Sequence, residues 1–87
     1  TVCFNQGDRS LECHGYDCLI WAIGRAPSVT SLQLEKAAVK VTDRGEIIVD
    51  KYQRSSAPNI LAIGDVTGRI PLTPVAIAAG RRLADRL

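Results

Sequence analysis

The sequence has no long apolar run, no methionine and no marked excess of either charge. No stretch approaches the roughly 20 apolar residues of a membrane-spanning helix, and the first residues lack the pattern of a signal peptide. The net charge of +2 is too small, and the basic residues too dispersed, to predict nucleic acid binding. We therefore expect neither a membrane nor a nucleic acid as a partner.

Cysteine is scarce and lacks the spacing of a metal site. The chain has three cysteines and one histidine, His14, with no C-x-x-C pair, so we expect no zinc site. Cys13 and Cys18 are separated by four residues but flank a turn that leads into an apolar stretch. A reactive thiolate is favoured at a helix start, so we interpret both as ordinary thiols. An odd cysteine count fits a reducing compartment and predicts a cytoplasmic protein.

The length of 87 residues is small for a domain, although an apolar fraction of 46% suits a globular protein. The sequence opens within a predicted strand, without methionine, and its last residue, Leu87, lies within a predicted helix. We therefore expect the chain to be part of a longer protein. The G-x-G-x-x-G fingerprint of dinucleotide-binding folds is absent.

A strand, a sharp exit and a helix are predicted around Gly64. Residues 60–63 are all apolar, which predicts a strand buried on both faces. Gly64 suits a turn, and Asp65 places a carboxylate beyond the strand end. Thr73 as N-cap and Pro74 at the first helical position predict a helix start. Ligands of open α/β sheets bind at such strand ends. Asp65 and the helix start are thus a candidate ligand site; the alternative is that both merely cap local structure.

The first third of the chain predicts a hairpin and a second buried strand. Residues 1–13 predict two short strands around a polar turn. Residues 17–23 are almost entirely apolar and predict a strand covered on both faces. Gly24 ends it, either to let a ligand approach the backbone or simply to turn the chain. Arg25 suits a cation near a diphosphate or a surface ion pair.

The middle of the chain predicts small, irregular elements. A domain boundary is expected near residue 27, where Pro27 forces an extended exit. Residues 32–38 predict a short helical turn. Residues 39–42 and 47–50 predict strands of a small β-meander around a turn at residues 43–46.

Three motifs resemble the pyridine nucleotide-disulfide oxidoreductases. Residues 60–65, ILAIGD, resemble the second FAD-binding motif of that family. Residues 18–27, CLIWAIGRAP, resemble the strand that links its NAD(P) and FAD domains. Residues 72–81, LTPVAIAAGR, are most similar to the glutathione reductase branch. The motifs occur in family order, and the resemblance extends from about residue 16 to the last residue.

The resemblance implies an α/β fold, as part of a Rossmann-like flavoprotein with two dinucleotide-binding domains and a small β-meander. It makes residues 1–27 the end of the NAD(P)-binding domain. It makes residues 28–87 a segment of the FAD-binding domain that stops before the interface domain.

The resemblance also implies contacts with FAD and NADPH. Asp65 is expected to accept hydrogen bonds from the ribityl chain of FAD. The backbone N–H of Thr73 is expected to meet the pyrimidine end of the flavin, where the helix dipole favours negative charge. The carbonyl of Pro71 is expected to meet the nicotinamide carboxamide; a proline there departs from the family but keeps that carbonyl. The implied cofactor-binding residues are Gly24, Gly64, Asp65, Pro71, Leu72 and Thr73.

The reaction implied is hydride transfer from NADPH to FAD, followed by reduction of a redox disulfide and then of glutathione disulfide. The redox cysteine pair and the catalytic histidine are expected outside this chain, which is therefore expected to be inactive alone. The resemblance implies a homodimer for the longer protein. Two alternatives remain: a related reductase of trypanothione, dihydrolipoamide or mercuric ion, or a non-catalytic interaction module. Residues 72–74 favour the glutathione or trypanothione branch.

Overall fold

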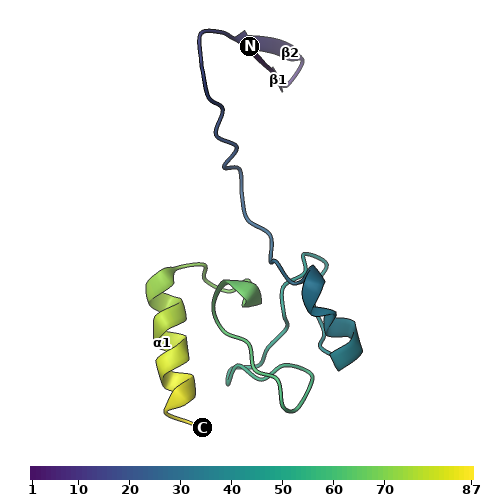
Figure 1. Ribbon diagram of the computed structural model, residues 1–87, viewed down its shortest axis with the longest axis vertical. Helices are drawn as coiled ribbons and strands as arrows, with labels where there is room; N and C mark the ends of the chain where they lie inside the picture. The colour runs from purple at the N-terminus through teal and green to yellow at the C-terminus, as the bar shows by residue number, and fades with distance from the viewer.

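A hairpin at the N-terminus stands apart from the rest of the molecule in the computed structural model, which describes residues 1–87 (Figure 1). Strands β1, Val2–Gln6, and β2, Arg9–Cys13, pair antiparallel, with Phe4 opposite Leu11. Gly7 holds the first position of the two-residue loop with a φ of 60°, as a type II′ turn requires. The predicted hairpin is confirmed.

The predicted strand at residues 17–23 is wrong for this chain. The segment that follows β2 extends away from the hairpin without a strand partner (Figure 1). Its apolar side chains lie in solvent, with Ile20 83% and Trp21 75% exposed. A strand needs a neighbour that accepts and donates main-chain hydrogen bonds, and no other segment of the chain lies beside this one.

The remaining elements surround a small core. They comprise three 3₁₀ turns, η1 (Thr30–Leu32), η2 (Leu34–Ala37) and η3 (Gly64–Thr67), and one helix, α1 (Thr73–Ala84). The four buried residues are Val39, Ile47, Ala57 and Ala62. Leu34, Val49, Ile60 and Val66 pack against them. This core holds η3 in place, because the amide of Ile47 donates to the carbonyl of Val66 at 2.8 Å.

The predicted β-meander forms only as isolated contacts. Val41 and Ile47 make a single antiparallel bridge. The turn predicted between them, at residues 43–46, is confirmed. No regular strand develops on either side of it, so the predicted strands at residues 39–42 and 47–50 are wrong. The helical turn expected at residues 32–38 forms as η1 and η2, separated by Gln33 at a φ of 49°.

The prediction of a strand covered on both faces at residues 60–63 is also wrong. One edge of this segment pairs with residues 53–55, through the Arg54–Leu61 bridge and the amide of Ala62 donating to the carbonyl of Gln53 at 3.0 Å. Ala62 is buried, whereas Leu61 and Ile63 are each 36% exposed. Alternate side chains are covered unequally, because Ala62 faces the core, Ile63 is only partly covered by α1, and the other edge of the segment has no strand beside it.

Helix α1 begins one residue earlier than the sequence predicts. Leu72 is the N-cap and Thr73 the first helical residue, so Pro74 occupies the second position. Thr73 therefore makes no side-chain cap, contrary to its predicted role. The carbonyl of Leu72 accepts from the amides of Val75 and Ala76 at 3.0 and 3.1 Å. Proline is still accommodated, because its missing N–H has no partner within the first turn.

Much apolar surface remains uncovered. The accessible surface is 7478 Å², against about 5,000 Å² for a compact monomer of this mass. The radius of gyration is 18.7 Å, against about 12 Å for a compact domain of this length. No helix combines the length and apolar character that crossing a bilayer requires.

Asp50 organises the turn that precedes residues 53–55. We expect the stability of this turn to fall at acid pH. Its Oδ1 accepts from the amides of Tyr52 at 2.7 Å and Arg54 at 3.0 Å. The bond from Arg54, with further help from Tyr52, lowers the pKa of this exposed carboxyl below its ordinary value of 3.8. Because the pKa in the folded state lies below that in the unfolded state, the ionised form stabilises the turn above about pH 4. That contribution is lost as the pH falls through the folded-state pKa.

An NMR titration of the Asp50 carboxyl group in the 87-residue chain checks this expectation. We expect a midpoint below 3.8. A midpoint for Asp50 at or above the value in the unfolded chain would contradict the assigned role of the two amide bonds.

Candidate functional site

Turn η3 projects Asp65 from a backbone that packs tightly against α1. Gly64 opens the turn with a φ of 76°, a conformation that side-chain-bearing residues rarely adopt. A Cβ atom on Gly64 would lie 3.3 Å from the Cβ of Ala76, and one on Gly80 would lie 3.3 Å from the Cδ1 of Ile63. Ala76 and Gly80 are four residues apart and share a helix face. Their small size allows residues 63–64 to approach α1 closely.

The carboxylate of Asp65 faces a partner that is remote in sequence. Nη1 of Arg25 donates to Oδ2 of Asp65 at 3.3 Å, and the two residues are 40 positions apart. The side chain of Asp65 is 48% exposed and that of Arg25 is 83% exposed. No side-chain hydrogen bond from Asp65 caps η3; only its carbonyl accepts, from the amide of Gly68 at 3.0 Å. The second carboxylate oxygen of Asp65, Oδ1, is thus free to accept hydrogen bonds from hydroxyl groups.

Asp65 and Pro71 line one hollow of about 510 Å³. The charged residues around it are two arginines and two carboxylates, Arg25, Arg44, Glu46 and Asp65. Glu46 is held on its own side by Thr42, whose hydroxyl donates to its carboxylate at 3.2 Å, and by Arg44 at 3.8 Å. The hollow therefore offers both hydrogen-bond acceptors and cations to a polar ligand.

The start of α1 offers a free donor near the same loop. Thr73 makes no backbone hydrogen bond through its N–H, and the following Pro74 has none to offer. Leu72 and Thr73 are exposed, so this N–H is accessible to a ligand. A helix start favours an electron-rich atom because its unpaired N–H groups carry partial positive charge.

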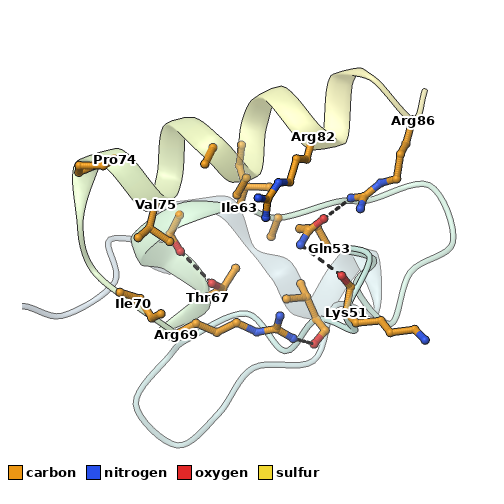
Figure 2. Close-up of a pocket in the computed structure, with 15 residues that line it drawn as sticks. Lys51, Gln53, Ile63, Thr67, Arg69, Ile70, Pro74, Val75, Arg82 and Arg86 are labelled. Carbon is orange, nitrogen blue, oxygen red and sulfur yellow. Dashed lines mark hydrogen bonds between the residues drawn. The ribbon is translucent and has the colours of Figure 1, made fainter.

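A second cavity, of about 470 Å³, lies between α1 and residues 49–53 (Figure 2). Apolar side chains such as Ile63 and Val75 line it, together with Lys51, Arg69, Arg82 and Arg86. Figure 2 shows Arg69 reaching across its floor. Nη2 of Arg69 donates to the carbonyls of Val49 at 2.7 Å and Asp50 at 3.0 Å. Arg86 donates to Gln53 from the end of α1. These bonds connect the loop after η3, and the residues that follow α1, to residues 49–53.

The structure brings together some of the candidate residues from sequence, but not all. Gly64 and Asp65 share η3, and Pro71 lines the hollow with Asp65. Leu72 and Thr73 line neither cavity but adjoin Pro71 in the chain. Gly24 does not line the hollow, but the residue that follows it, Arg25, does. The cofactor contacts of these residues stay predictions.

Sequence analysis left the role of Arg25 open and missed Arg69 and Glu46. For Arg25, the structure shows the surface ion pair, with Asp65 as its partner, and a role beside a diphosphate stays a prediction. The partner of Arg25 is 40 residues away, so no local spacing indicated it. One signal for Glu46 was available: Gly68 has a φ of 66°, and a Cβ there would overlap the Glu46 carboxylate. Gly68 thus indicates that another group lies close to its backbone, but the sequence alone does not identify that group as Glu46.

The three cysteines are free, and Cys13 and Cys18 form no disulfide. No cluster of three or more histidine, cysteine, aspartate or glutamate side chains forms. His14 contacts the hydroxyl of Thr1 at 2.8 Å and lies 3.4 Å from the carboxylate of Glu12, both in its immediate surroundings on the hairpin.

Comparison with known proteins decides the family. Residues 2–80 match the pyridine nucleotide-disulphide oxidoreductase family. The chain belongs to this family. The resemblance drawn from the three motifs is thereby confirmed, and with it the flavoprotein fold class.

Two curated relatives show which branch of the family the chain resembles. The chain is 56% identical to a glutathione reductase of Schizosaccharomyces pombe over 99% of its own length. It is 55% identical to a glutathione reductase of Yarrowia lipolytica over 82% of its length. It covers only 18% and 15% of those two relatives.

A solved family structure has a similar backbone. The HOCl-induced flavoprotein disulfide reductase RclA from Escherichia coli is 41% identical and superimposes with a TM-score of 0.73. The match covers 76% of this chain and 15% of that one. A Cu(II) complex of the same reductase gives a TM-score of 0.72.

Proposed function

We propose that the chain is the flavin-contacting part of a longer enzyme that uses NADPH to reduce glutathione disulfide. The identity of 56% to a glutathione reductase, over 99% of the chain, carries this proposal. The uncovered apolar surface agrees with it, because residues 17–23 have the composition of a buried strand but lack neighbours in this chain, and residues 60–63 pair on one edge only. We call the longer enzyme the parent reductase.

The residues at the hollow fit the hydroxyl-rich part of FAD. The half-exposed carboxylate of Asp65 has one oxygen, Oδ1, without a hydrogen-bond partner. Such an oxygen accepts hydrogen bonds from the ribityl chain. The free N–H of Thr73 matches an electron-rich atom at the pyrimidine end of the ring, and the dipole of α1 favours negative charge there. When bound, FAD supplies the hydride acceptor of the reaction.

The nicotinamide side of the site rests on Gly24 and Pro71 in this proposal. Pro71 is exposed, and its backbone carbonyl is an acceptor for a carboxamide, while its ring restricts φ at this position. Gly24 has no side chain to obstruct a nucleotide, and nothing lies within 4 Å of where its Cβ would be. We assign NADPH as the hydride donor because the relatives at 55–56% identity are glutathione reductases.

We further propose that the parent reductase is a homodimer that assembles through regions outside this chain. We place it in the cytoplasm, because three free cysteines suit a reducing compartment. A second candidate is a flavoprotein disulfide reductase with another substrate. The identity of 41% to RclA favours it, since that reductase shares the backbone without being named a glutathione reductase.

The reading frame on both sides of the chain tests the proposal. We expect a G-x-G-x-x-G fingerprint, a Cys-x4-Cys pair and a second nucleotide fingerprint before residue 1. We also expect an interface domain with a histidine after Leu87. A frame that closes immediately on both sides would instead leave a binding module and overturn the assignment of catalysis.

A further inference from the structure

The ion pair between Arg25 and Asp65 joins the end of the extended segment to η3. Arg25 follows the extended segment at residues 17–23, and Asp65 lies in η3. The 3.3 Å contact between Nη1 and Oδ2 is the one side-chain hydrogen bond of either residue. Both residues line the same hollow.

This geometry allows Asp65 to pair with Arg25 and to accept hydrogen bonds from a ligand at the same time. A carboxylate has two oxygens and about four lone-pair directions. Arg25 occupies Oδ2, and Oδ1 stays open toward a ligand. No cap or second side chain fixes the carboxylate. Without Arg25, a half-exposed aspartate samples several rotamers, and binding a ligand must then fix one of them at an entropic cost.

We propose that Arg25 is a positioning residue, which holds the Asp65 carboxylate in the orientation that receives the ribityl hydroxyls of FAD. The inference rests on the proposed function, because it takes Asp65 as the acceptor for the flavin. It also gives the 17–27 segment an indirect role in flavin binding, because Arg25 acts on the flavin through Asp65.

Arg44 provides a matched control. It is also an exposed arginine at the same hollow, and it also pairs with a carboxylate, that of Glu46 at 3.8 Å. It makes no contact with Asp65. The experiment uses the full-length parent reductase in its FAD-bound form, with Arg25→Gln, Arg44→Gln and Arg25→Lys variants. FAD dissociation is followed by the rise in fluorescence as the flavin is released.

We expect Arg25→Gln to raise the dissociation constant for FAD about two- to fivefold, the effect typical of an exposed ion pair. Arg44→Gln removes a cation from the same hollow without removing the partner of Asp65, and it should raise the constant less than Arg25→Gln does. Arg25→Lys keeps the positive charge and should restore part of the loss. Equal effects of Arg25→Gln and Arg44→Gln would overturn the inference, as would an Arg25→Lys variant no better than Arg25→Gln.

A double-mutant cycle separates positioning from direct binding. In an Asp65→Asn background, we expect Arg25→Gln to have no further effect on FAD release. An equal effect in both backgrounds would mean that Arg25 binds the cofactor directly, for example at its diphosphate, and would overturn positioning. If Asp65→Asn alone left FAD binding unchanged, the failure would lie with the proposed role of Asp65 instead.

Discussion

Replacing Asp65 with alanine in the parent reductase is expected to weaken FAD binding roughly ten- to hundredfold. A hydrogen bond to a charged acceptor contributes about 1.5–3 kcal/mol, which corresponds to that range of affinity. The structure presents this carboxylate with one oxygen unpartnered, beside a hollow of about 510 Å³. The dissociation constant, measured by flavin fluorescence after stepwise dilution, reports the change directly.

Asp43→Ala is the control for this prediction. Asp43 is an exposed aspartate in the turn at residues 43–46, outside both cavities. Its removal should leave FAD binding at the level of the unmodified enzyme. If Asp65→Ala and Asp43→Ala behaved alike, Asp65 would have no part in holding the flavin.

Gly64→Ala is expected to have the largest effect on stability. An L-residue in the left-handed conformation costs about 1–2 kcal/mol, and Gly64 has a φ of 76°. The added methyl would also lie 3.3 Å from Ala76. Overpacking at such a contact costs typically about 1–3 kcal/mol. The combined cost of roughly 2–5 kcal/mol should lower the temperature of flavin release in the parent reductase by several degrees.

Comparison with Gly15→Ala separates the packing cost of Gly64→Ala from its conformational cost. Gly15 has a similar φ of 79°, but nothing lies within 4 Å of where its Cβ would be. It should therefore carry the conformational cost alone and shift the release temperature less than Gly64→Ala does. Equal shifts would show that the contact between η3 and α1 contributes nothing.

Features with a local cause were predictable from sequence. The hairpin follows from a glycine-containing turn between two short strands, and η3 begins at the glycine where the chain was expected to turn. Helix α1 formed within one residue of its predicted start, since Pro74 suits the first turn wherever the cap lies. In each case the determining residues lie within a few positions of one another.

Features that depend on distant partners were not predictable. The composition of residues 17–23 is that of a buried strand, yet Trp21 is 75% exposed because the main-chain neighbours are absent from this chain. Residues 60–63 pair on one edge only, for the same reason. At the site, Asp65 was indicated by its position after a predicted strand end and by resemblance, and Pro71 by resemblance alone. The Arg25–Asp65 pair spans 40 residues and needed coordinates.

Turnover of glutathione disulfide by the purified, FAD-bound parent reductase tests the central claim most directly. The measurement is NADPH oxidation with glutathione disulfide, compared in parallel with trypanothione disulfide, lipoamide and mercuric ion. Identity of 55–56% to two glutathione reductases predicts that glutathione disulfide supports the fastest turnover. NADPH oxidation with one of the other acceptors, and none with glutathione disulfide, would contradict the account and assign the chain to a different reductase of the same family.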